Sequence, residues 1–232
     1  MGIILSLKQT NNRYNTKSTP KYTRQLMKPS WHSASKELVD ILDHHQINGF
    51  EAPGGTDKNT IHNYTGIYEH LLAPYRCTSK KSGTLLELGV QFGGSSLLWH
   101  DYLPNFYLHL VDIADAVPTK IWDQMEKERY SFHVCNGYCM DTVELLTEKA
   151  PEKFDVIIED GPHNLQSQLF AVEHYYPLLK PGGTLIIEDI QDSAHLKILT
   201  NAVSSDALTV NIFDVRHTKG RYDDLIWTVT KQ

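Results

Sequence analysis

Two apolar runs in the second half of the chain each end in acidic residues. Residues 154–159 are followed by Asp160 and, three positions later, by His163, and a second run leads to Glu188 and Asp189. A histidine can take up a proton near neutral pH. Three neighbouring carboxylates repel one another unless a cation neutralises them, and a hard divalent ion such as Mg²⁺ prefers oxygen ligands. The pattern predicts a metal held by the three carboxylates that lowers the pKa of a substrate hydroxyl, with His163 as the base.

Simpler interpretations of the same residues stay open. The segment from Asp160 to His163 could be a plain turn in which His163 caps the following helix. Glu188 and Asp189 are adjacent, and neighbours in a regular strand point to opposite faces. Both can bind one metal only if the strand ends before them.

A glycine-rich segment after an earlier apolar run predicts a site for a nucleoside-bearing cofactor. Residues 84–96 have the sequence TLLELGVQFGGSS, and a second apolar run ends at Asp112. Glycines let the backbone approach a ligand, and a carboxylate can accept hydrogen bonds from both hydroxyls of a ribose. The spacing differs from the G-x-G-x-x-G pattern of NAD-binding proteins. Glu87, two residues before Gly89, favours S-adenosylmethionine (SAM) instead.

The loop after this first strand is expected to wrap the amino-acid end of SAM, and residues 136–141 are expected to cover its adenine. The alternatives are an ordinary strand–helix turn for the glycines and helix capping for Asp112 and Asp141. The residues predicted to bind the cofactor are Glu87, Gly89, Gly93, Ser95, Asp112, Ile113, Cys139, Met140 and Asp141.

The elements that must position these residues alternate between strands and helices from residue 84 onward, which predicts a parallel sheet with helices on both faces. The predicted strands are 84–89, 106–112, 130–135, 154–159, 183–188, 208–214 and 224–230, and the predicted helices are 31–50, 60–73, 94–102, 119–128, 141–149, 164–179 and 192–203. The connection 216–222 is too short for a helical crossover, so the last two strands should pair antiparallel. The predicted fold class is therefore α/β: a Rossmann-like class I methyltransferase with a seven-stranded, mostly parallel sheet and a terminal antiparallel hairpin.

Composition divides the chain into three predicted parts: a flexible basic arm (1–30), a helical cap that contributes to the site (31–80) and a SAM-binding domain (81–232). The arm has six basic and no acidic residues, whereas the remainder has 16 basic and 28 acidic residues. Because nucleic-acid binding demands a basic face, no nucleic-acid partner is expected. The arm begins with the loose N-myristoylation pattern MGIILS, but no stable membrane insertion is expected. Three cysteines match no zinc spacing, which predicts reduced thiols and a cytoplasmic location.

The motifs resemble the metal-dependent sugar O-methyltransferases of macrolide biosynthesis (the mycinamicin and macrocin type) and the cephalosporin hydroxylase-like proteins. The similar segments are FDVIIEDGPHNLQSQ and LKPGGTLIIEDIQ, which match the family's D-D-G-S-H, G-G and E-D pattern, and the earlier GTDK and HNYTGIYEH. The resemblance covers residues 54–192. It implies Asp160, Glu188 and Asp189 as Mg²⁺ ligands and His163 as general base. It also implies that the segment 55–70 lines the cofactor and acceptor side, with Lys58 and Tyr64 as candidate residues there, although Tyr64 could instead be a packing residue of its helix.

The sequence departs from the family pattern at Pro162, where serine is usual, and at Tyr138, where the loop lacks the family's first aspartate. The predicted function is SAM- and metal-dependent methylation of a sugar hydroxyl, such as that of a deoxyhexose like rhamnose in a glycan or glycoside. The partner is then a small-molecule or glycan acceptor, and a homo-oligomer is left open. The alternatives are methylation of a phenolic or catechol acceptor and a SAM-binding scaffold without catalysis.

Overall fold

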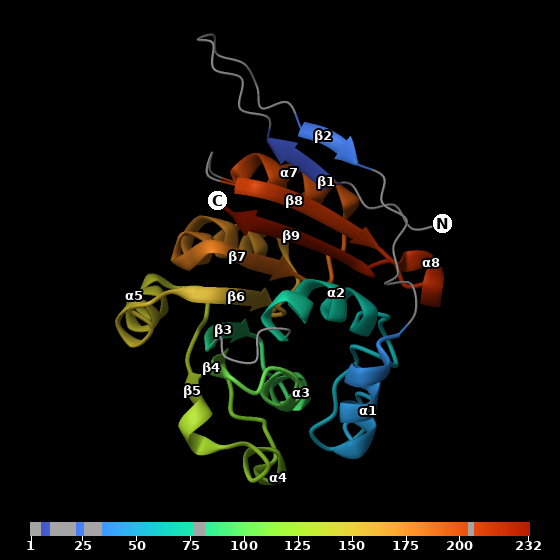
Figure 1. Ribbon diagram of the computed structural model, residues 1–232, viewed down its shortest axis with the longest axis vertical. Coiled ribbons are helices and arrows are strands. Elements are labelled where there is room, and N and C mark those ends of the chain that lie inside the picture. Colours follow the sequence, from blue (N-terminus) through green and yellow to red (C-terminus); the bar gives the residue numbers. More distant parts are fainter. Residues whose placement is uncertain (1–5, 10–21, 26–33, 77–81, 204–206) are drawn as a thin grey trace.

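The computed structural model describes residues 6–9, 22–25, 34–76, 82–203 and 207–232, which form one nine-stranded sheet with helices on both faces (Figure 1). The strand order is β2-β1-β8-β9-β7-β6-β3-β4-β5. Strands β3 to β7 are parallel to one another, and β9 lies antiparallel between β7 and β8. The bounds of the strands are β1 Ser6–Gln9, β2 Tyr22–Gln25, β3 Gly83–Leu88, β4 Phe106–Asp112, β5 Tyr130–Val134, β6 Phe154–Glu159, β7 Leu179–Ile187, β8 Ala207–Asp214 and β9 Leu225–Lys231.

The helices cover the two faces of this sheet because successive strand residues point to opposite sides. Leu85 packs in the core that holds α1, α2 and α3, whereas Leu86 packs in the core that holds α5 and α7. This period of two is expected for strands buried on both faces. The bounds of the α-helices are α1 Lys36–His44, α2 Thr65–Arg76, α3 Gly94–Tyr102, α4 Thr119–Trp122, α5 Met140–Lys149, α6 Leu165–Phe170, α7 Ser193–Ala202 and α8 Arg216–Lys219. None of these helices is long and apolar enough to cross a membrane.

The seven predicted strands are confirmed as β3 to β9, including the antiparallel pairing of the last two. The structure adds two strands from the predicted arm: β1 pairs with β8, and β2 forms the outer edge of the sheet (Figure 1). Gly2 of the acylation pattern and Cys77 lie outside the described residues.

Several predicted helix boundaries are corrected. The helix predicted over 119–128 is a single turn, α4, followed by a 3₁₀ turn at Lys127–Arg129. The helix predicted over 164–179 is α6 followed by a π-helical turn (Ala171–Tyr175) and a 3₁₀ turn (Tyr176–Leu178), and β7 already begins at Leu179. The Lys180–Gly183 segment therefore belongs to the strand. Pro177 explains the change, since proline is tolerated only in the first turn of a new helical segment.

The sheet order determines which loops can share a site. At one edge of the sheet the chain leaves β7, β6, β3, β4 and β5 at their carboxyl ends and enters β9, because β9 runs the opposite way. Six loops therefore lie side by side in the order β9, β7, β6, β3, β4, β5. In open α/β sheets this edge is where ligands bind.

A buried histidine in the middle of β4 gives a testable acid sensitivity. Burial and the nearby His133 lower the pKa of His109 in β4 to about 4. The unfolded chain takes up a proton below pH 6.5, whereas the folded chain does so only near pH 4, so stability is lost as pH falls through this window. Between pH 6.5 and 5 the loss attributable to His109 is up to about 2 kcal/mol.

The melting temperature of His109→Gln should therefore fall less than that of the wild type when the pH is lowered from 7 to 5. Scanning calorimetry at both pH values measures the difference. Above pH 7.5 the His109 imidazole is neutral in both the folded and the unfolded chain, so there the difference in melting temperature between the two proteins should not change with pH. An equal acid-induced loss in both proteins would show that His109 does not govern the sensitivity.

Candidate active site

A cavity of about 610 Å³ lies at the carboxyl edge of the sheet and is lined by all six loops. Its volume is in the range of small-molecule sites. Of the residues predicted from the sequence, it contains Gly89, Ser95, Asp112, Ile113, Asp160, His163 and Asp189. The order of the loops places the β3–β5 side of the cavity at one end and the β7–β9 side at the other, with Asp160 between them.

Asp112 organises the loop that follows β3. Its Oδ2 accepts hydrogen bonds from the backbone N–H groups of Val90 and Gln91, both at 2.8 Å, and its Oδ1 accepts one from Ala114 at 3.0 Å. A carboxylate has about four lone-pair positions, so Asp112 can still accept from a ligand hydroxyl. The three N–H groups belong to loops, and the N-cap residues of α3 and α4 are Gly93 and Pro118, so Asp112 caps no helix and its contact with a ligand stays a prediction.

Gly89 is required at its position for two reasons. Its φ of +93° lies in the left-handed region, and a Cβ there would approach the carbonyl oxygen of Asp160 to 2.1 Å. The glycine thus brings the end of β3 against the end of β6. This contact links the predicted cofactor loop to the predicted catalytic residues.

Two predicted cofactor residues hold α3 instead of facing the cavity. Glu87 is fully buried, and its carboxylate accepts hydrogen bonds from Ser96 Oγ at 2.5 Å and Trp99 Nε1 at 2.9 Å. Burial raises the pKa of Glu87, and the charge of Lys58 and these hydrogen bonds act against that rise. Gly93 is the residue before the first turn of α3, with a φ of +79°. Both residues orient the helix that presents Ser95 to the cavity.

The loop after β5 lines the cavity with residues that come before the predicted ones in the sequence. Asn136, Gly137 and Tyr138 line the cavity, whereas Cys139, Met140 and Asp141 are not among its lining residues. Cys139 precedes the first turn of α5, and the exposed Asp141 lies in that turn. An acid there suits the positive end of the helix dipole, but Asp141 is not the cap, because the N-cap residue is Cys139 and no side chain caps the helix.

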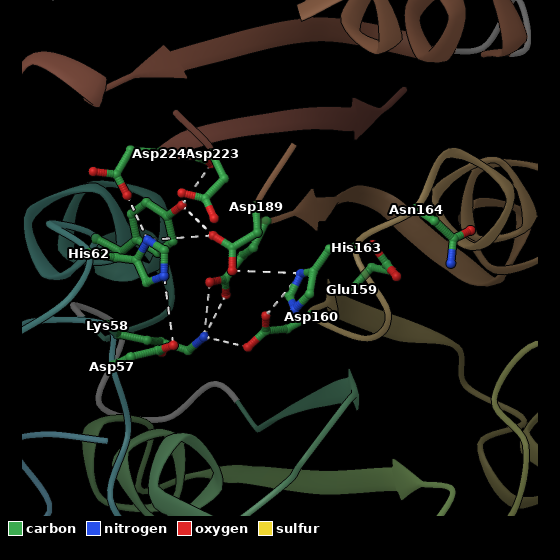
Figure 2. Close-up of polar contacts among 12 residues, drawn as sticks. Asp57, Lys58, His62, Glu159, Asp160, His163, Asn164, Asp189, Asp223 and Asp224 are labelled. Atoms are coloured by element: carbon green, nitrogen blue, oxygen red, sulfur yellow. Dashed lines mark hydrogen bonds and ion pairs between the residues drawn. The ribbon is translucent and has the colours of Figure 1, made fainter. Parts of the chain in front are cut away.

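A buried lysine lies inside the carboxylate cluster (Figure 2). Lys58 Nζ donates to Asp160 Oδ2 at 2.8 Å and to the two Glu188 oxygens at 2.8 and 2.9 Å. Burial lowers the pKa of Lys58, but the charges of Asp160 and Glu188 outweigh it and hold the pKa well above its usual value. Lys58 is therefore an ammonium, and its place is among the carboxylates and not on the cavity wall.

One ammonium does not neutralise three carboxylates. Burial and the charge of Asp160 raise the pKa of Asp189 to about 6 and also raise the pKa of Glu188. Tyr68 donates to Glu188, and Tyr64 donates to Asp189 Oδ1 at 2.5 Å. Tyr64 is therefore both a buried packing residue and a contact of the carboxylate cluster. The cluster carries two uncompensated negative charges when all three acids are ionised.

His163 and Asp189 have a strained backbone where they face each other. Their φ angles are +54° and +50°, a region that non-glycine residues rarely adopt and that is common at functional sites. His163 Nδ1 lies 3.6 Å from Asp189 Oδ2 and 4.0 Å from Asp160 Oδ1, and it is buried with no hydrogen-bond partner. The capping alternative for His163 is excluded, because Asn164 Oδ1 caps α6 by accepting from Ser167 N–H.

The donor set fits a divalent cation. Asp160, His163 and Asp189 offer ligand atoms within 4.8 Å of one another, and the excess negative charge of the carboxylates favours a bound cation. The strand has ended at Ile187, so Glu188 and Asp189 need not alternate as in a regular strand. The predicted ligand Glu188 is nevertheless held by Lys58 and Tyr68. Of the three predicted metal ligands, Asp160 and Asp189 line the cavity, whereas Glu188 is not among its lining residues.

A second buried cluster lies beside this one; His62 belongs to the segment 55–70 expected on the acceptor side, but neither it nor Asp224 was singled out from the sequence. His62 Nδ1 lies 2.6 Å from Asp224 Oδ1 and 3.6 Å from Asp189 Oδ1. Burial lowers the pKa of His62, but the Asp224 hydrogen bond and the charges of Asp189 and Asp57 outweigh it, so the pKa is raised. The available signal was the pair Asp223-Asp224 directly before the last apolar strand, since an aspartate is almost never fully buried unless it is paired.

Comparisons with known proteins indicate similarity to methyltransferases. Residues 86–190 match the family model described as a methyltransferase domain. A rhamnosyl tetracenomycin-C 2'-O-methyltransferase from Streptomyces olivaceus is 31% identical over 161 residues, which cover 63% of this chain and 38% of that protein. The mycinamicin VI 2''-O-methyltransferase from Micromonospora griseorubida is 24% identical over 137 residues, or 56% of this chain and 32% of that protein. The chain thus spans well under half the length of these curated relatives.

Solved structures show the same fold. The MycE methyltransferase of mycinamycin biosynthesis, in complex with Mg, S-adenosylhomocysteine (SAH) and mycinamycin VI, has a TM-score of 0.62 at 19% identity, over 86% of this chain and 54% of that chain. An O-methyltransferase from Bacillus cereus in complex with SAH has a TM-score of 0.58 at 14% identity, over 88% of this chain and 92% of that chain. The class I methyltransferase fold and the resemblance to sugar O-methyltransferases are confirmed.

Proposed function

We propose that this chain, which carries a methyltransferase domain over residues 86–190, transfers the methyl group of SAM to a sugar hydroxyl in a reaction that depends on a divalent cation. One observation carries the proposal: a single cavity joins the Asp112 loop to His163, Asp160 and Asp189. The curated relatives named above are sugar O-methyltransferases, and the MycE structure contains Mg and SAH, which supports the same cofactors here.

The residues of the chain divide the work along the cavity. When bound, SAM would supply an electrophilic methyl group, and a divalent ion would lower the pKa of the acceptor hydroxyl. Asp112 and Gly89 shape the loop that would bind SAM, and Asp160 and Asp189 would hold the ion. His163 accepts the hydroxyl proton, and the resulting imidazolium is stabilised by the carboxylates at 3.6 and 4.0 Å from its Nδ1. The deprotonated acceptor oxygen would form a bond to the methyl carbon as the carbon–sulfur bond of SAM breaks, which leaves SAH.

The far end of the cavity favours a sugar over a phenolic acceptor. A catechol or phenol would need a hydrophobic slot, whereas Asp57, His62, Arg221 and Asp223 line this end. Intact acids and an available base also argue against a scaffold without catalysis. A cytoplasmic location and a homo-oligomer stay predictions.

Calorimetric titration with SAH, with and without Mg²⁺, tests the proposal. The wild type should bind SAH and not NAD, and Asp112→Asn should bind SAH at least about tenfold more weakly, because an amide cannot accept all three backbone N–H bonds. A methyl-transfer assay on methyl α-L-rhamnopyranoside, other neutral methyl glycosides and catechol should give SAH only with the glycosides and only until EDTA is added. Absence of SAH binding would overturn the proposal. Methyl transfer to catechol alone would show that the acceptor is a phenol and not a sugar.

A further inference from the structure

The cavity extends beyond Asp189 to a group of residues that methyl transfer itself does not use. Asp57 and His62 come from the segment before α2, and Arg221 and Asp223 come from the segment before β9. These two segments are far apart in the sequence and meet beside the end of β7. The methyl donor is expected on the β3–β5 side, so this end of the cavity lies on the acceptor side.

His62 is held in one orientation at this end. Asp224, which is fully buried, accepts a hydrogen bond from His62 Nδ1 at 2.6 Å, and the ring stacks on Tyr64 with centroids 4.7 Å apart. The bond at Nδ1 makes Nε2 the second functional atom of the ring, and Nε2 lies 3.6 Å from Asp57 Oδ2. Figure 2 shows His62 and His163 on opposite sides of Asp189. Asp224 Oδ2 is buried with no partner among the described residues.

The charge of this end determines what it can bind. Arg221 lines this end of the cavity, and its guanidinium is already bound to Asp223 through Nε at 3.1 Å and Nη2 at 2.9 Å. Asp57, Asp189 and Asp224 surround His62 with further carboxylates. Such a wall accepts hydrogen bonds from hydroxyl groups and repels phosphate or carboxylate.

We propose that His62, oriented by Asp224, binds a second hydroxyl of the acceptor, and that the carboxylates around it select an uncharged sugar over an anionic one. This inference rests on the proposed function and adds an acceptor subsite to it. His62 is a specificity-determining residue, and His163 remains the base. The transferred methyl group and the proton follow the path already described.

The test compares His62→Gln with His70→Gln, a histidine replacement on the exposed face of α2. His62→Gln should raise the KM for methyl α-L-rhamnopyranoside at least about tenfold, since a lost hydrogen bond to a charged pair costs roughly 1.5–3 kcal/mol. Its kcat at saturation should fall less than KM rises, and its Kd for SAH should stay within about twofold of the wild-type value. His70→Gln should match the wild type in all three.

The outcomes separate this inference from the proposed function. If His62→Gln binds SAH and retains the wild-type KM, the acceptor subsite is wrong while the methyltransferase proposal stands. If the wild type binds SAH but methylates none of the neutral glycosides, both proposals fail. A His62→Gln protein that no longer binds SAH would make His62 a structural residue and also overturn the subsite.

Asp57→Asn supplies an independent check, because the Asp57 side chain is 30% exposed and its removal should not unfold the protein. The ratio of kcat/KM for the neutral glycoside to that for methyl α-D-glucopyranosiduronic acid should fall severalfold in this variant. The repulsion of the anionic sugar would then have been reduced. An unchanged ratio would contradict charge selection at this end of the cavity.

Discussion

Replacing His163 by asparagine is expected to lower kcat for methyl transfer by 10²–10⁴-fold, the usual contribution of a general base. Asparagine tolerates the left-handed conformation better than other non-glycine residues, so the loop with its φ of +54° should keep its shape. It cannot accept the hydroxyl proton. The Kd for SAH should change by no more than about threefold, because the β3–β5 side of the cavity is untouched.

Asn164→Ala is the matched control for this variant. It removes the cap of α6 next to His163, which should cost about 1 kcal/mol of stability with little loss of kcat. Single-turnover rates and SAH titrations on both proteins distinguish a lost base from a disturbed loop. Retention of wild-type kcat by His163→Asn would remove His163 from the mechanism.

Of the substitutions proposed here, Lys58→Met is expected to lower the free energy of unfolding most. The side chain is 1% exposed, and its ammonium lies between Asp160 and Glu188. Breaking a buried ion pair on one side leaves the remaining charge without a partner and typically costs about 3–5 kcal/mol. For a chain of this size the melting temperature should fall by roughly 6–20 °C.

Two further measurements connect this loss to the ammonium. In Lys58→Met/Glu188→Gln the unpartnered Glu188 charge is gone, so the double variant should be more stable than Lys58→Met alone. Millimolar Mg²⁺ should raise the melting temperature of Lys58→Met more than that of the wild type, since three carboxylates then lack any internal cation. Lys36→Met, on the exposed face of α1, is the control and should stay close to the wild type. A stable Lys58→Met protein would show that the carboxylates do not need this lysine.

The strands and the residues at their ends could be predicted from the sequence because both are local properties. Near-continuous apolar runs are typical of strands in a parallel sheet, and the carboxyl ends of such strands meet at one edge. Asp112, Asp160, His163 and Asp189 follow directly from this rule, and all four line the cavity. The antiparallel pairing of β8 and β9 followed from a connection too short to cross the sheet.

The partners of these residues were decided only by the tertiary structure. Lys58 contacts residues 102 and 130 positions away, and His62 contacts a residue 162 positions away. No pattern within one segment encodes which buried cation meets which buried acid. Glu87 shows the reverse case: its position before Gly89 indicated a ligand contact, yet in the folded chain Ser96 and Trp99 bind its carboxylate.

The strands could be predicted and the buried charge pairs could not, because the hydrophobic pattern is local along the chain whereas the pairing of buried charges depends on tertiary packing. Hydrophobic period and turn chemistry act between neighbours along the chain, so one sequence suffices to predict strands, turns and the edge where their ends converge. A buried charge has to be paired by whatever group the packing brings within hydrogen-bond distance. The sequence therefore determined the edge of the sheet and the acids on it, and the packing of the 54–70 segment against that edge decided which of those acids remain open to a ligand.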